Sequence, residues 1–153
     1  MVTYLDHAAS TPMRHEAIEA MTPFLDNLYA NPSGSHRFAR VARKALDEAR
    51  DVVAEALACN AGEVIFTSGG TEGDNSAVLG TVRKLGGVAV CTATEHHAVL
   101  HCVEHVDGVV VRVNNVGSVD LDDLARVLQE ATPEKPITVV SVMAVNNEVG
   151  TIT

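Results

Sequence analysis

Four short, mainly apolar runs constrain the fold of this chain more than any other feature. They occupy residues 64–67, 88–92, 109–113 and 137–143, and they lack the regular alternation of apolar and polar positions. Strands of this kind are buried on both faces, as in a parallel sheet that helices cover on each side. Helical patterns fall between them, near residues 71–85, 98–106 and 120–131. The sequence therefore predicts an α/β fold with a mainly parallel sheet.

Two further helices are expected nearer the N-terminus. Residues 35–58 keep a 3.6-residue apolar period with charged residues opposite, which predicts one long helix. Thr11 and Pro12 resemble a helix cap followed by proline in the first turn, and Pro23 should then kink or break that helix. Apolar residues make up 46% of the chain but aromatic residues only 3%, so Val, Ala and Leu must fill the core.

Composition excludes several classes of function. The formal net charge is −9, and an acidic chain is a poor binder of nucleic acid. No window has the roughly 18 consecutive apolar residues of a membrane-spanning helix, and the first residues lack the pattern of a signal peptide. Cys59, Cys91 and Cys102 are odd in number and form no C-x-x-C motif, as expected of reduced thiols in a cytoplasmic protein.

A glycine-rich turn follows the first apolar run. Thr67-Ser68-Gly69-Gly70-Thr71 leads directly into a predicted helix. Free N–H groups and the positive dipole end of such a helix form a cradle for an anion, most often phosphate. There is no P-loop lysine and no G-x-G-x-x-G motif. The alternative is an ordinary turn between strand and helix, in which Thr71 only caps the helix.

Polar residues follow two of the other apolar runs. His96 comes just after the run at 88–92, and Asn146, Asn147 and Glu148 end the run that begins at Ile137. Ligands of open parallel sheets bind at the carboxyl ends of the strands, so these residues are candidates for a site. Histidine can stack on a flat heteroaromatic ring and transfer a proton near neutral pH. The alternatives are a histidine that caps the next helix and asparagines that form a simple turn.

The remaining histidines suggest a metal site less strongly. His97, His101 and His105 recur every four residues on one predicted helix, with Cys102 and Glu104 close by. This stripe could bind zinc or nickel, but it contains no H-E-x-x-H motif and supplies few ligands for a structural site. We expect a solvated helix face and no bound metal.

Five motifs occur in an order that resembles a known family. They are Tyr4 to Pro12, Asn31 to His36, Thr67 to Asn75, Thr94 to Leu100, and Val142 to Gly150. Together they resemble the N-terminal part of a cysteine desulfurase of the NifS/IscS type, in the class V aminotransferase family of pyridoxal-phosphate enzymes. The resemblance implies an incomplete large domain of the aspartate-aminotransferase-like fold (fold type I), with three αβα layers. Residues 1–15 would join the small domain, and residues 16–153 would form the first part of the large, cofactor-binding domain.

The resemblance also implies roles for particular residues. Gly70 and Thr71 match the pair that holds the phosphate of pyridoxal phosphate. His96 matches the histidine that stacks on the pyridine ring and takes part in acid–base catalysis. Asn147 matches the asparagine that contacts the ring hydroxyl, and His7 and Asn31 lie in segments that border the substrate end of the pocket.

The implied reaction converts L-cysteine to L-alanine and transfers sulfur to an enzyme cysteine, for iron–sulfur clusters or tRNA thiolation. The family forms homodimers and passes sulfur to a scaffold protein or a tRNA-thiolation enzyme. Its chains run to about twice this length or more, and its Schiff-base lysine, ring acid and persulfide cysteine all lie beyond the Asn-Asn-Glu motif. Lys44, Lys84 and Lys135 match no family motif. We therefore expect this chain alone to be inactive and unable to bind the cofactor covalently. The alternatives are a selenocysteine lyase, a small aminotransferase or a non-catalytic truncated product.

Overall fold

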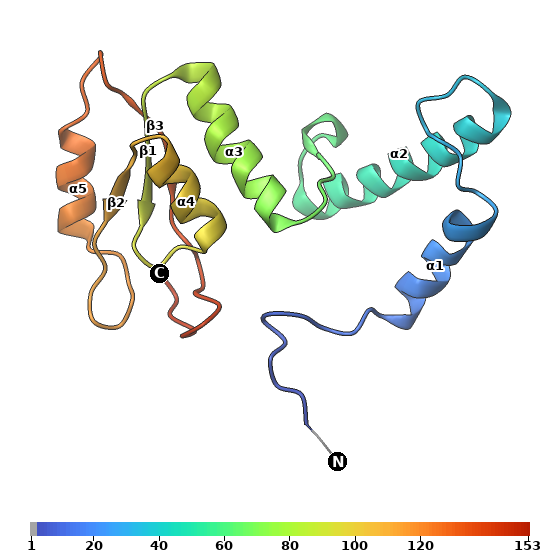
Figure 1. Cartoon of the computed structure of the whole chain (residues 1–153), viewed down its shortest axis with the longest axis horizontal. Helices are drawn as coiled ribbons and strands as arrows, with labels where there is room; N and C mark the ends of the chain where they lie inside the picture. Colours follow the sequence, from blue (N-terminus) through green and yellow to red (C-terminus); the bar gives the residue numbers. More distant parts are fainter. Residues whose placement is uncertain (1–2) are drawn as a thin grey trace. The chain divides into compact units, whose positions relative to one another are not determined.

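The computed structural model describes residues 3–153, and contacts divide the chain into two units at Phe66 and Thr67. The first unit contains three helical elements and the second contains a parallel sheet with its helices (Figure 1). In the described residues, no helix combines the length and the apolar character needed to cross a membrane. The division expected near residue 15, between a small-domain segment and the large domain, stays a prediction.

The first unit is built from α1 (His15–Asp26), α2 (Arg37–Leu57) and the short 3-10 helix η1 (Ala61–Glu63). The expected cap at Thr11 is wrong, since α1 begins after Arg14 and has no side-chain cap. A break at Pro23 is also wrong, because α1 runs on to Asp26. The long helix α2 is confirmed, and the Nδ1 atom of His36 caps it by accepting the N–H of Ala39 at 3.2 Å.

The second unit is an α/β structure. It consists of α3 (Gly70–Leu85), β1 (Val88–Thr92), α4 (His97–His105), β2 (Val109–Val111), α5 (Leu121–Gln129) and β3 (Ile137–Ser141). The strands pair in the order β2-β1-β3, and both pairings are parallel. Val90 and Cys91 of β1 lie opposite Val109 and Val110 of β2. The predicted α/β fold with a parallel sheet is confirmed.

The central strand β1 is buried on both faces, which explains its uninterrupted apolar sequence. Ala89 and Cys91 pack with Val78 of α3 and with Val99 and Val103 of α4. On the opposite face, the core consists of Val88, Val90, Val111 and Val127. Helices α3 and α4 therefore cover one side of the sheet and α5 covers the other, which gives three layers (Figure 1).

The structure corrects the expected strands at three places. Residues 64–67 form no strand, and none of the strands in the described part of the chain pairs with them. An apolar run becomes a strand only when another strand satisfies its N–H and C=O groups. Strand β2 ends at Val111, and Val113 instead forms an isolated antiparallel bridge with Val119. Strand β3 ends at Ser141, two residues earlier than expected.

Candidate functional site

The N-terminus of α3 is open to an anion. Gly69 occupies the cap position and supplies no side-chain cap. A methyl group added to Gly69 or Gly70 would meet no atom within 4 Å. The Glu72 carboxylate accepts the N–H of Ser68 at 2.6 Å, outside the helix, and this hydrogen bonding lowers the pKa of Glu72. The first N–H groups of the helix therefore remain available to a ligand.

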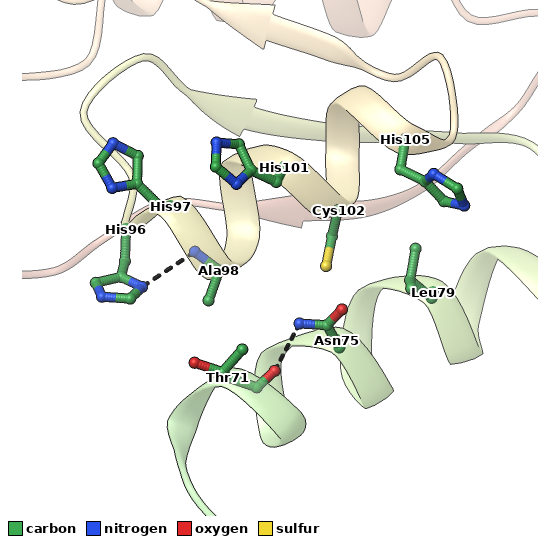
Figure 2. A pocket seen from close by; sticks show the side chains of 9 residues that line it. All are labelled: Thr71, Asn75, Leu79, His96, His97, Ala98, His101, Cys102 and His105. Atoms are coloured by element: carbon green, nitrogen blue, oxygen red, sulfur yellow. Dashed lines mark hydrogen bonds between the residues drawn. The ribbon is translucent and has the colours of Figure 1, made fainter.

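Thr71 borders a cavity of about 580 Å³ between α3 and α4. Its carbonyl oxygen accepts the side-chain N–H of Asn75 at 2.6 Å. In the part of the chain that the structure describes, the Thr71 hydroxyl makes no hydrogen bond of its own. Figure 2 shows Thr71 and Asn75 on α3, with His96 and Ala98 across the cavity at the start of α4.

His96 caps α4. Its Nδ1 atom accepts the N–H of Ala98 at 3.1 Å, which is the capping role that the sequence left open as an alternative (Figure 2). Because Nδ1 accepts this bond, the neutral imidazole carries its proton on Nε2. The side chain is exposed apart from this bond, so its ring face and Nε2 can contact a ligand.

Asn147 lies in a hairpin after β3 that its neighbour Asn146 shapes. The Asn146 Oδ1 atom accepts the N–H groups of Glu148 and Val149, both at 2.9 Å. Val145 and Ile152 close the hairpin as an antiparallel bridge. The side chain of Asn147 is exposed and borders a second cavity, of about 340 Å³.

The residues to which the resemblance assigned cofactor contacts do not all border one cavity. Thr71 and His96 line the larger cavity, whereas His96 and Asn147 line the smaller one. His96 and its neighbour His97 border both cavities and connect the two parts of the candidate site. Thr71, His96 and Asn147 thus lie around two adjoining cavities of the second unit. The other expected segments, with His7 and Asn31, belong to the first unit.

Sequence reasoning did not identify Glu95. This residue is 9% exposed, borders the smaller cavity, and accepts a hydrogen bond from the Ser141 hydroxyl at 2.9 Å. A glutamate so deeply buried is unusual unless it is hydrogen-bonded. In the sequence, only its position immediately before His96 indicated that Glu95 could belong to the site.

The side chains of the histidine stripe, His97, His101 and His105, are exposed and border the larger cavity. The rings of His97 and His101 stack, with centroids 5.4 Å apart and planes inclined by 17°. Within residues 3–153, no three His, Cys, Asp or Glu side chains are grouped so that they could hold a metal ion. That no metal binds here stays a prediction.

The buried thiols are unsuited to chemistry in this site. Burial, together with the charges of Glu95 and Glu104, raises the pKa of Cys91 to about 11. Burial and Asp74 also raise the pKa of Cys102. Thiols with raised pKa values are poor nucleophiles because the thiolate is the reactive form. All three cysteines are free, and Cys59 is exposed.

Comparison with known proteins identifies the family. The profile described as "Aminotransferase class-V" matches residues 3–153. The cysteine desulfurase IscS of Dictyoglomus turgidum is 43% identical over 157 residues, which cover 97% of this chain and 39% of that protein. The putative cysteine desulfurase IscS 1 of Bacillus subtilis is 42% identical, with 97% of this chain and 40% of that protein covered.

Solved structures agree with these sequence matches. A NifS-like protein superposes with a TM-score of 0.84 at 32% identity, over 99% of this chain and 43% of that one. The NifS-like protein from Rickettsia africae gives a TM-score of 0.82 at 31% identity, over 97% of this chain and 41% of that one.

The chain therefore spans about two fifths of the length of the curated relatives it matches, about 39% and 40% for the two named above. The resemblance to NifS/IscS-type proteins and the fold type that it implied are both confirmed. With a profile match over residues 3–153, this chain belongs to the aminotransferase class-V family.

Proposed function

We propose that this chain forms the phosphate-binding and ring-binding part of the pyridoxal-phosphate site of a cysteine desulfurase. The observation that carries the proposal is the position of His96 between two cavities, one shared with Thr71 and the other with Asn147. The relatives that bear the name cysteine desulfurase support the choice of reaction. No observation favours a selenocysteine lyase or a small aminotransferase.

The residues present fit the chemical groups of this cofactor. The uncapped N-terminus of α3 and the Thr71 hydroxyl offer hydrogen-bond donors to a phosphate. The exposed imidazole of His96 offers a flat face to an aromatic ring. The Asn147 amide can donate to a ring oxygen. Cavities of about 580 Å³ and 340 Å³ also lie in the size range of small-molecule sites.

Bound pyridoxal phosphate would supply the electron sink that carbon–sulfur bond cleavage requires. The residues of this chain would bind and orient it. Thr71 and the N–H groups of Gly70 and Thr71 would hold the phosphate, and Asn147 would fix the rotation of the ring. Oriented donors that are in place before binding lose little free energy to rearrangement.

His96 would contribute both stacking and proton transfer. Its Nδ1 atom is committed to the Ala98 N–H at 3.1 Å, so only Nε2 exchanges a proton with a ligand. The cap also limits rotation of the ring. We therefore assign His96 a catalytic role in addition to cofactor binding.

The wider function that we propose follows the named relatives. The substrate would be L-cysteine, and the sulfur would pass to an enzyme cysteine for iron–sulfur clusters or tRNA thiolation. The Schiff-base lysine and the persulfide cysteine would come from polypeptide outside the motifs present here. We further propose a cytoplasmic homodimer that acts with a sulfur-acceptor scaffold protein or a tRNA-thiolation enzyme.

A binding experiment with pyridoxine 5′-phosphate tests the proposed site. This compound carries the same ring, hydroxyl and phosphate but has an alcohol in place of the aldehyde, so it forms no Schiff base with any lysine. We expect one-to-one binding by calorimetry. Thr71→Val should weaken it about tenfold, because a hydrogen bond to a charged group is lost.

Ser76→Ala is the matched control, because Ser76 lies exposed on the same helix and borders neither cavity. Equal affinity of Thr71→Val and Ser76→Ala would contradict the phosphate assignment. In a separate assay, the 153-residue chain with pyridoxal phosphate and L-cysteine should release no sulfide above a control with free cofactor.

A further inference from the structure

Two hydrogen bonds join the segment that carries His96 to the segment that carries Asn147. The Ser141 hydroxyl, at the end of β3, donates to the Glu95 Oε1 atom at 2.9 Å. The Asn146 side-chain N–H donates to the Thr94 carbonyl oxygen at 3.0 Å. In each case one partner lies within two residues of His96, and Asn146 immediately precedes Asn147.

We propose that Glu95 and Asn146 are positioning residues that fix the separation between the His96 ring and the Asn147 amide. This inference rests on the proposed function, in which both side chains contact the same flat ligand. Neither Glu95 nor Asn146 needs to touch that ligand. They act through the adjacent residues, because each holds a backbone segment from which a contacting side chain projects.

The cost of burying Glu95 argues against an incidental contact. The residue is 9% exposed, and among the ion pairs of residues 3–153 it has no cationic partner. Removing a carboxylate from water without a compensating charge is costly, and an apolar pair would join the turn before α4 to β3 at a lower cost. A buried, hydrogen-bonded polar pair instead specifies one geometry.

Every polar group of the Asn146 side chain is used in this arrangement. Its Oδ1 atom shapes the hairpin through Glu148 and Val149, and its Nδ2 atom reaches Thr94. The same amide therefore sets the direction of the hairpin and ties it to the turn before α4. Asn147, the next residue, is left exposed at the smaller cavity beside His96.

Thr71 takes no part in these two bonds. A ligand that contacts only the phosphate-binding residues can therefore distinguish a loss of positioning from a loss of folding. Inorganic phosphate should probe the N-terminus of α3 alone, whereas pyridoxine 5′-phosphate should probe the phosphate, ring and hydroxyl contacts together. Loss of the two bonds should weaken binding of the second compound and leave binding of the first unchanged.

The experiment uses Asn146→Asp, Ser141→Ala and the double variant in the full 153-residue chain. Asn146→Asp keeps the Oδ1 acceptor of the hairpin, but it replaces the donor to Thr94 with a negatively charged carboxylate oxygen. Asn114→Asp is the matched control, because Asn114 Oδ1 accepts the N–H groups of Val116 and Ser118 in a similar turn, and Asn114 borders neither cavity.

We expect about fivefold weaker binding of pyridoxine 5′-phosphate for each single variant, and a larger loss for the double variant. These variants should bind inorganic phosphate as tightly as the unsubstituted chain does. Asn114→Asp should bind both pyridoxine 5′-phosphate and inorganic phosphate as tightly as the unsubstituted chain. Glu95→Gln should bind nearly normally, because glutamine retains an acceptor for Ser141, whereas Glu95→Ala should behave like Ser141→Ala. NMR should show that the His96 ring and the Asn147 amide lose their fixed separation in the double variant.

Two outcomes of the binding assay would overturn the inference. One is unchanged affinity of the double variant for pyridoxine 5′-phosphate. The other is an equal loss for both probes together with a lower melting temperature, which would show a purely structural role. If the unsubstituted chain binds no pyridoxine 5′-phosphate, the proposed function fails, and the NMR separation alone then decides the inference. An unchanged separation in the double variant would overturn it.

Discussion

Replacing Gly108 with alanine should destabilise the second unit, because the space beside this residue is already filled. Gly108 lies between α4 and β2, and its N–H donates to the Val103 carbonyl oxygen at 2.8 Å. An added methyl group would collide with the Ala89 carbonyl oxygen, would lie 2.6 Å from Val103 Cγ1, and would lie 2.9 Å from the Val103 carbonyl oxygen. Two of these three atoms belong to the backbone of β1 and α4, so no side-chain rotation relieves the contact.

The magnitude follows from two opposing terms. Overpacking a filled site costs about 1–3 kcal/mol, and backbone obstacles place Gly108→Ala near the upper end. Alanine also reduces the conformational entropy of the unfolded chain, which stabilises the folded state by about 0.5–1 kcal/mol. We expect a net loss of about 2 kcal/mol in the free energy of unfolding.

Gly80→Ala is the matched control within α3. A methyl group there meets no atom within 4 Å, and alanine favours the helix interior by about 0.5–1 kcal/mol. The two substitutions are chemically identical, so their difference of about 3 kcal/mol isolates the steric cost. Urea denaturation followed by circular dichroism would measure it, and hydrogen exchange of the β1 amides would report the opening of the sheet locally. If Gly108→Ala proves as stable as Gly80→Ala, the close packing of α4, β1 and β2 is refuted.

Two further predictions concern titratable groups of the second unit. The Asp123 carboxylate is buried and accepts hydrogen bonds from the Arg112 N–H at 2.9 Å and the Arg126 guanidinium at 2.8 Å, which hold its pKa well below the ordinary value. Its stabilising effect is therefore present above the ordinary carboxyl pKa of about 4 and is lost as the pH falls further. Melting temperatures measured down to about pH 2 should fall less steeply for Asp123→Asn, and equal slopes would contradict this. Iodoacetamide at neutral pH should modify the exposed Cys59 first, since burial raises the pKa of Cys91 to about 11. Mass spectrometry would follow the labelling, and early labelling of Cys91 would contradict this prediction.

Several elements of the structure could be predicted from local sequence patterns alone. The uninterrupted apolar run at β1 predicted a strand buried on both faces, and Ala89 and Val90 indeed pack on opposite sides of the sheet. The 3.6-residue period of α2 and the Gly-Gly-Thr start of α3 were likewise sufficient, because helix periodicity and helix termini depend on neighbouring residues. The resemblance of five short motifs indicated the family, and it implied roles in cofactor binding for Thr71, His96 and Asn147.

Other features depend on residues that are far apart in the sequence and meet only in the folded chain. Residues 64–67 have the composition of a strand but form none, because a strand requires another strand to satisfy its backbone. The bonds from Ser141 to Glu95 and from Asn146 to Thr94 span 46 and 52 residues. No periodicity encodes such pairs, since the sheet brings these residues together only after β1 and β3 have paired.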